Sequence, residues 1–176
     1  MSVKSNLCGA LLGVIVSMYS FSSYAQETIH VGTEPTFAPF GFVDDKTSEI
    51  VGFDIDVINA IGKAEGMKVV IESMQFDGLI PSILSNSIDA AISGMTKNPE
   101  REKMVLFSDP YYVAGQDLMV RKDSVGKYKN MESLEGKGVC VQLGSVGAIV
   151  AGSIKDADVK NFNNVTEAYM ELKKHG

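Results

Sequence analysis

A segment that combines hydroxyl side chains with an arginine is the clearest candidate for chemistry in this sequence. Ser93, Thr96 and Arg101 lie close together, after a short apolar run at residues 90–92 and around a proline. The apolar run predicts a buried strand, and the proline predicts the first turn of a helix that carries Arg101. Backbone N–H groups, a hydroxyl and a guanidinium at such a junction suit a carboxylate, so the segment predicts an anion-binding site. The alternative is an ordinary helix cap beside a solvated arginine.

Three further side chains follow directly after predicted strands. Glu34 and Phe37 follow a strand predicted at residues 28–33, and Phe76 follows one predicted at residues 67–71. Ligands of α/β sheets collect at the carboxyl ends of the strands. We therefore expect the two aromatic rings to enclose the apolar part of a small ligand. The alternative for Phe37 is a loop aromatic that packs into the core.

A glycine-rich turn repeats the strand-to-helix geometry later in the chain. Gly-Ser-Val-Gly at residues 144–147 lies between a strand predicted at 139–142 and a helix predicted at 148–154. Its backbone N–H groups, which include those of Ser145 and Val146, can meet the same anion from the other side. The alternative is an ordinary glycine-rich turn, since a four-residue pattern is a weak signal.

The elements that position these residues alternate in two blocks. Strands and helices alternate over residues 29–92 and again over 139–174, which predicts an α/β fold, and a further strand at 113–120 is predicted to leave the first block. We expect a first lobe over residues 26–113, then a hinge strand and a partial second lobe over residues 114–176. No strand follows the last predicted helix, so we expect the second lobe to be incomplete. The elements not yet given are a strand at 158–162, a helix with its apolar face over residues 53–61, a helix that follows the loop at 75–78, and a helix at 165–174.

The first predicted helix raises the question of a metal site. Its apolar residues recur at helical spacing and are predicted to face the sheet: Phe53, Val57, Ile58 and Ile61. Asp54 and Asp56 lie in its first turn. Two aspartates can bind a metal, but the exposed N–H groups and the helix dipole already explain carboxylates at a helix N-terminus. We therefore predict no metal site there.

Residues 1–25 are predicted to be a secretory signal peptide. Lys4 precedes an apolar stretch at residues 7–18, and Ser-Tyr-Ala at residues 23–25 matches the pattern before a cleavage point. The apolar stretch is shorter than the roughly 20 residues that a spanning helix needs, which disfavours a membrane anchor. We therefore expect export to the periplasm.

Composition argues against several classes of partner and chemistry. The formal net charge of −6 disfavours nucleic acid or anionic lipid as a partner. Cys140 is the only cysteine after the predicted signal peptide, so no internal disulfide is expected, and its β-branched surroundings predict a small buried hydrophobe. His30 and His175 are the only histidines, which removes most metal sites and any Ser-His-Asp arrangement. We expect no metal and no cofactor.

Six segments carry a resemblance to a known family: residues 32–40, 51–56, 76–81, 94–101, 107–112 and 141–147. From residue 28 onward the chain resembles the family 3 extracellular solute-binding proteins, and among them the periplasmic receptors for polar amino acids such as glutamine, histidine and arginine. The resemblance implies a type II periplasmic binding protein-like clamp of two α/β lobes. It also implies a monomer that closes on one free L-amino acid without catalysis and delivers it to the permease of an ABC importer.

The resemblance implies a role for each predicted site residue. Arg101 would fork onto the ligand α-carboxylate, helped by the backbone N–H groups of Thr96 and Val146. The Gly94 carbonyl and the Thr96 hydroxyl would take the α-ammonium. The other predicted site residues surround the ligand side chain: Phe37 and Phe76 beside it, Glu34 and Gln142 at its far end, and Ser93 and Ser145 nearby.

The sequence departs from the family pattern at three points. Glu34 stands where close relatives have aspartate, which predicts a shallower pocket floor. Val146 replaces threonine or glycine, which removes a hydroxyl but keeps the N–H. The aspartate that the family places in the second lobe to bind the α-ammonium would lie beyond Gly176.

The ligand and the class of protein stay open on sequence alone. A carboxylate at Glu34 favours a ligand side chain with hydrogen-bond donors and disfavours glutamate or aspartate. Because Gln142 beside it is neutral, we place glutamine ahead of arginine, lysine or histidine. The alternative is an enzyme on the same scaffold, a periplasmic cyclohexadienyl or arogenate dehydratase, with Glu34 as its only local general acid. A third alternative is that the chain is the sensor module of a larger signalling protein.

Overall fold

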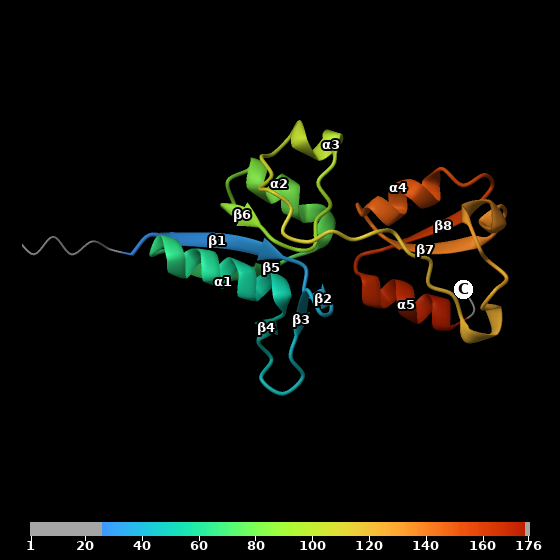
Figure 1. The fold of residues 1–176 in the computed structure, drawn as a ribbon, viewed down its shortest axis with the longest axis horizontal. Helices are drawn as coiled ribbons and strands as arrows, with labels where there is room; N and C mark the ends of the chain where they lie inside the picture. The colour runs from blue at the N-terminus through green and yellow to red at the C-terminus, as the bar shows by residue number, and fades with distance from the viewer. Residues whose placement is uncertain (1–25, 175–176) are drawn as a thin grey trace, which may run out of the picture.

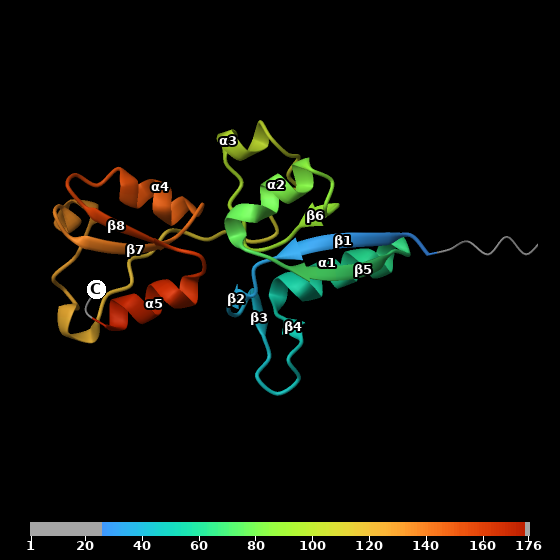
Figure 2. The same ribbon diagram turned by 180° about the vertical axis from the view of Figure 1, so that it is seen from behind.

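The computed structural model describes residues 26–174, which form two α/β lobes that lie end to end (Figure 1). The predicted signal peptide, residues 1–25, lies outside the described residues. Seen from behind, the two lobes are joined by the segment that follows α3 (Pro99–Glu102) (Figure 2). Within residues 26–174, no helix is both long enough and apolar enough to cross a bilayer.

The first lobe is built around β1 (Thr28–Thr33), which is the middle strand of a parallel sheet. It pairs with β5 (Lys68–Ser73) on one side and β6 (Ala90–Ala91) on the other, in the order β5-β1-β6. The register places Val31 opposite Ile71 and Ala90. Because the strands are parallel, their carboxyl ends meet at one edge, and β1 points this edge toward the second lobe (Figure 1).

One face of this sheet is covered by α1 (Phe53–Glu65). Val31, which is fully buried, packs there with Ile58 of α1 and with Ile92, and Val57 adds a half-buried contact. These contacts form the core on this side of the lobe. The prediction that Val57 and Ile58 face the sheet is confirmed.

The same prediction is wrong for Phe53 and Ile61, whose side chains are 42% and 46% exposed. Gly62 faces the sheet in place of Ile61, because the helix approaches β5 so closely there that a Cβ on Gly62 would collide with Val69. Phe53 instead packs edge-on against Phe40, with ring centroids 6.1 Å apart.

The opposite face is covered by η1 (Phe76–Gly78) and α2 (Leu79–Leu84). Leu79 is fully buried and packs with Phe76 and Ile88 in a second core cluster. The packing leaves no room for a side chain on Gly32, where a Cβ would lie 2.6 Å from Ile88 Cδ1. Successive residues of β1 therefore serve different faces, as the pleat of a strand requires.

A small antiparallel sheet was not predicted from the sequence. It consists of three very short strands in the order β2-β3-β4 and projects from the first lobe as a hairpin (Figure 1): β2 (Thr36–Phe37), β3 (Gly41–Val43) and β4 (Ile50–Val51). Prolines and glycine interrupt the alternating pattern here, and strands of two or three residues leave too little periodicity to detect.

The second lobe contains a two-stranded parallel sheet with helices on both sides. Its strands pair along their full length, and the predicted strand at 158–162 is confirmed. Ser145 and Asn164 cap the two main helices through their side-chain oxygens. The elements are η2 (Lys122–Ser124), η3 (Met131–Leu134), β7 (Gly138–Gln142), α4 (Val146–Gly152), β8 (Asp158–Phe162) and α5 (Val165–Lys173).

The predicted hinge strand at residues 113–120 is wrong. The chain is irregular there, and no described strand pairs with it. Its β-branched and apolar residues suggest a strand, but a strand needs a hydrogen-bonding neighbour, and Val113 is 91% exposed. The segment instead passes from the first lobe into the second.

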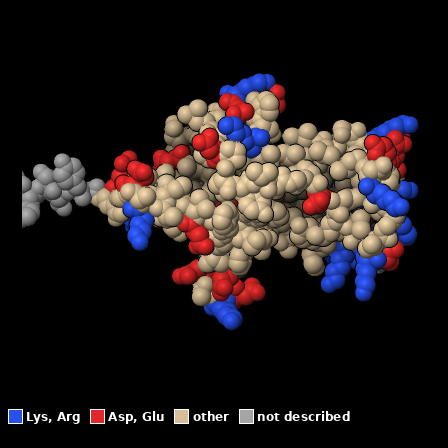
Figure 3. Space-filling model, in the orientation of Figure 1, with Lys and Arg blue, Asp and Glu red and all other residues tan. Residues whose placement is uncertain are grey.

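Charged side chains lie mainly at the periphery on the face shown in Figure 3, around the hairpin, α3 and the far end of the second lobe. Both signs are interspersed there, and the middle of this face carries few charges. Lys and Arg side chains predominate at the far end of the second lobe, and Asp and Glu predominate around the hairpin.

Candidate functional site

A cavity of about 880 Å³ lies between the lobes and extends into the second one. It is lined by all ten residues that the sequence analysis selected: Glu34, Phe37, Phe76, Ser93, Gly94, Thr96 and Arg101 from the first lobe, and Gln142, Ser145 and Val146 from the second. The structure therefore brings together residues that lie more than 100 positions apart in the chain, such as Glu34 and Gln142, which are 108 apart.

The first-lobe residues are positioned by the carboxyl ends of its parallel strands. Glu34 follows β1, and its backbone N–H donates a 3.0 Å hydrogen bond to Ser93 Oγ, just after β6. Ser93 thus connects two strand ends rather than pointing a free hydroxyl into the cavity. Asn98 caps α3 by accepting a 2.9 Å bond from the Arg101 N–H, which starts the turn that carries the guanidinium.

The Arg101 side chain is buried and bridges the two lobes. Its Nη1 donates to the Thr96 carbonyl at 2.6 Å, and its Nη2 donates to the Gly144 carbonyl of the second lobe at 2.9 Å. The guanidinium carbon lies 5.5 Å from the centroid of the Phe76 ring, within the range of a cation–π interaction. Burial lowers the pKa of Arg101.

Glu34 forms a second polar connection between the lobes. The residue is 5% exposed, and its Oε2 accepts hydrogen bonds from Thr36 Oγ1 at 2.9 Å and from Gln142 Nε2 at 3.2 Å. Among the described residues these partners are neutral, and no salt bridge of Glu34 is formed. The cavity thus contains a buried carboxylate as well as a buried guanidinium.

The two predicted aromatic walls differ in exposure. Phe37 is 41% exposed and lines the cavity, while Phe76 is only 8% exposed and is part of the α2-side core. Phe37 stacks on Phe40, with ring centroids 5.5 Å apart and an interplanar angle of 13°. Phe40 in turn packs edge-on against Tyr112, with ring centroids 5.0 Å apart.

Sequence reasoning gave Asp54 only a local role at the N-terminus of α1, but the residue is fully buried. Its carboxylate accepts a 2.7 Å bond from the Gly94 N–H and a 2.9 Å bond from the Tyr111 hydroxyl. Burial raises the pKa of Asp54, and the two hydrogen bonds oppose that shift. The helix dipole explained this carboxylate without any tertiary partner. Its two partners could not be seen in the local sequence, because both lie 40 or more positions away.

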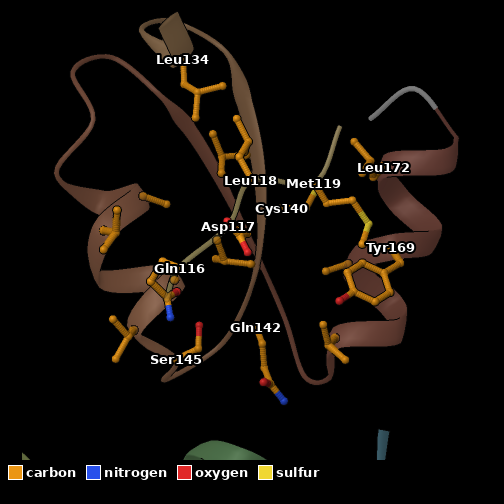
Figure 4. A pocket seen from close by; sticks show the side chains of 18 of the residues that line it. Gln116, Asp117, Leu118, Met119, Leu134, Cys140, Gln142, Ser145, Tyr169 and Leu172 are labelled. Atoms are coloured by element: carbon orange, nitrogen blue, oxygen red, sulfur yellow. The ribbon is translucent and has the colours of Figure 1, made fainter. Parts of the chain in front are cut away.

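The second-lobe part of the cavity was also missed. Figure 4 shows Gln116, Asp117, Leu118 and Met119 running through it, in the segment that was predicted as a strand. Cys140 lines this part and is half-buried, and burial raises the pKa of its thiol. Within residues 26–174, no three His, Cys, Asp or Glu residues gather as metal ligands.

The sequence profile of the bacterial extracellular solute-binding proteins, family 3, matches residues 29–176. The chain belongs to this family. A probable histidine-binding protein of Campylobacter jejuni is 37% identical over 146 residues, which cover 83% of this chain and 56% of that protein. A putative ABC transporter arginine-binding protein 2 of Escherichia coli is 38% identical over 135 residues, which cover 77% of this chain and 54% of that protein. This chain thus spans about half the length of these relatives.

Solved structures show the same fold. The arginine-bound form of truncated ArgBP from T. maritima is 46% identical with a TM-score of 0.80, over 84% of this chain and 69% of that one. The ancestral amino acid-binding protein AncCDT-1, a precursor of cyclohexadienyl dehydratase, is 40% identical with a TM-score of 0.79, over 84% of this chain and 66% of that one. The predicted type II fold of two α/β lobes is confirmed by these likenesses.

Proposed function

We propose that this protein is the periplasmic substrate-binding component of an amino-acid ABC importer. It captures one free amino acid between its lobes and delivers it to the membrane permease, without catalysing a reaction. The observation that carries the proposal is the interlobe cavity, which is lined by residues of both lobes and contains the buried guanidinium of Arg101 and the buried carboxylate of Glu34. The family membership and the names of the relatives support it.

In this proposal Arg101 binds the α-carboxylate of the ligand. A guanidinium has five N–H donors, and the Thr96 and Gly144 carbonyls accept from two nitrogens. Donors therefore remain for a carboxylate, together with the backbone N–H groups of Thr96 and Val146. A zwitterion that leaves water must find such partners, because an unpaired buried charge costs several kcal/mol.

We further propose that the preferred side chain is cationic, with arginine first. The Glu34 carboxylate is buried and has only neutral partners among the described residues, so a guanidinium or ammonium group would compensate its charge. This reverses the order expected from the sequence, which placed glutamine first. Glutamine is the second candidate, since an ancestral arginine-binding protein that resembles this chain has been solved with glutamine bound, at 44% identity.

Titration calorimetry with arginine, lysine, histidine, glutamine and glutamate tests the proposal. We expect arginine to bind most tightly, glutamine more weakly and glutamate not at all. Tightest binding of glutamate would contradict the placement of Glu34 at the side-chain end of the ligand. Absence of binding by every amino acid would contradict the receptor function itself.

A dehydratase is the second candidate function. The likeness to AncCDT-1, a precursor of cyclohexadienyl dehydratase, favours it, and Glu34 is a buried carboxyl in the cavity that would protonate a leaving hydroxyl. Incubation with arogenate or prephenate, with detection of phenylalanine or phenylpyruvate, separates the two functions. Turnover that Glu34→Gln abolishes would establish the enzyme.

A further inference from the structure

Asp54 lies between the cavity and the segment that connects the lobes. On one side its carboxylate holds the N–H of Gly94, which lines the cavity. On the other side it holds the hydroxyl of Tyr111, which lies two residues before the irregular segment at 113–120. The carboxylate is fully buried, so each of these hydrogen bonds lies where an unpaired oxygen is costly.

Gly94 depends on this contact for its position. Its φ of 56° is in the left-handed region, and a Cβ there would lie 3.7 Å from the Phe37 ring. Its N–H donates a 2.7 Å hydrogen bond to the Asp54 carboxylate. If the carboxylate moves, the peptide that borders the cavity therefore moves with it.

Aromatic contacts connect the same two places by a separate route. Phe37 in the cavity wall stacks on Phe40, which contacts Tyr112 at 5.0 Å. Phe53, next to Asp54, contacts the Tyr111 ring at 6.0 Å. Tyr111 and Tyr112 thus pack against Phe40 and Phe53, and the chain beyond them passes to the second lobe.

We propose that Asp54 and Tyr111 are a positioning pair, which couples Gly94 in the ligand cavity to the start of the segment that joins the lobes. The inference rests on the proposed amino-acid binding. A shift of the connecting segment moves the Tyr111 hydroxyl, the Asp54 carboxylate follows it, and Gly94 is displaced from the ligand. Neither residue lines the cavity, so both set the affinity for the ligand through Gly94.

The alternative role for Asp54 is local, as a negative charge at the N-terminus of α1. That role is independent of Tyr111 and affects the stability of the helix rather than the affinity for a ligand. Affinity measured well below the melting temperature separates the two, because a loss of stability does not change ligand binding while the protein stays fully folded.

Tyr111→Phe is the decisive variant, and Tyr112→Phe is its matched control. Each variant removes one tyrosine hydroxyl from neighbouring positions. Of these two hydroxyls, only that of Tyr111 forms a hydrogen bond within the described residues. Calorimetry with arginine should show about tenfold weaker binding for Tyr111→Phe, as expected for a lost hydrogen bond to a charged group. Tyr112→Phe should stay within about twofold of the unchanged protein.

Asp54→Asn provides the conservative rescue. The amide keeps an acceptor for the Gly94 N–H and a group that bonds the Tyr111 hydroxyl, so its affinity should exceed that of Asp54→Ala. In the Asp54→Ala background, Tyr111→Phe should cause no further loss.

Equal affinities of Tyr111→Phe and Tyr112→Phe would overturn the coupling and leave the receptor function intact. An additional full loss from Tyr111→Phe in the Asp54→Ala background would also overturn it. If the unchanged protein binds none of the amino acids tested, the proposed function fails, and the coupling fails with it.

Discussion

At the scale of single residues, Arg101 shows how one side chain serves both the fold and the site. It is 7% exposed, it joins carbonyls of the two lobes, and it lies over the Phe76 ring. This arrangement requires a planar group with several donors, which lysine does not have. Glu34 is the acidic counterpart in the same cavity, and these two residues carry the sharpest predictions about ligand binding.

Arg101→Lys should weaken arginine binding by at least about tenfold, since the charge remains but the bidentate geometry is lost. Arg101→Ala should weaken it further, by about 3 kcal/mol or more, because a buried carboxylate is left unpaired. Calorimetry measures both. Lys97→Ala is the control, because Lys97 is a nearby exposed cation outside the cavity lining. A loss of less than about tenfold in Arg101→Ala would remove this residue from the proposed role.

Glu34→Gln should change ligand preference rather than abolish binding. The amide has nearly the shape of the carboxylate, so the cavity keeps its form while the negative charge is removed. Arginine binding should fall by at least about tenfold, and glutamine binding should fall less or increase. Competition calorimetry with the two amino acids measures the change. Equal losses for both would show that Glu34 does not select for charge.

At the scale of elements, the turn between β7 and α4 controls how closely the lobes approach. Gly144 has a φ of 73°, and its carbonyl accepts the Arg101 bond. A Cβ at this position would lie 3.0 Å from Asp77 Cβ and 3.3 Å from its Cα, which is backbone of the first lobe. The turn therefore combines a left-handed conformation with a close contact between lobes.

Gly144→Ala should lower both stability and arginine affinity. The left-handed conformation costs a non-glycine residue about 1 kcal/mol or more, and the added methyl meets the backbone near Asp77. Thermal unfolding and calorimetry measure the two effects. Gly152→Ala is the matched control, because Gly152 is exposed in α4 and has open space around its Cβ position. Equal behaviour of the two variants would contradict the importance of the Gly144 contact.

The hairpin between β3 and β4 should depend on pH through Asp44. Its carboxylate accepts hydrogen bonds from the backbone N–H groups of Thr47 and Lys46, which lower the pKa of Asp44 below its usual 3.8. Since the folded-state pKa is lower than the unfolded one, the stabilisation is present above pH 3.8 and is lost as pH falls through the folded-state value. Asp44→Asn should remove this part of the acid dependence, as measured by urea unfolding across that range. An unchanged acid dependence in the variant would contradict the assignment.

At the scale of the whole molecule, the two lobes differ in how their cores are built. Within residues 26–174, both clusters of mutually packed buried side chains lie in the first lobe, on the two faces of its three-stranded sheet. The second lobe has a two-stranded sheet, and such a sheet is marginal without packing against other elements. Arg101 and Glu34 supply polar bonds between the lobes.

We therefore expect the second lobe to open before the first. In hydrogen exchange, the amides of β7 and β8 should exchange faster than those of β1 and β5, because their local opening exposes less buried surface. Leu79→Ala removes a fully buried side chain in the first lobe. It should lower the free energy of opening of β1 by about 2–5 kcal/mol, which accelerates exchange there, and should leave exchange in β7 little changed. Equal protection of the two sheets would contradict this order.

The sequence by itself determined the local elements and the residue types of the site. β1 and β8 were predicted with their observed bounds, since apolar alternation and short apolar runs are local signals. The ten residues chosen from strand ends and family motifs all line one cavity. The unpaired segment at 113–120 was mispredicted, because apolar composition does not reveal whether a neighbouring strand exists.

Only the tertiary structure decided which of these residues meet. The Arg101 bond to Gly144 spans 43 positions, the Asp54 bond to Tyr111 spans 57, and the Glu34 bond to Gln142 spans 108. Such contacts follow from strand order and from the approach of the lobes, and no local pattern encodes either. Asp54 illustrates the difference. In the sequence, the helix dipole is enough to explain an aspartate at this position, but the structure shows that the side chain is fully buried and bonded to two distant partners.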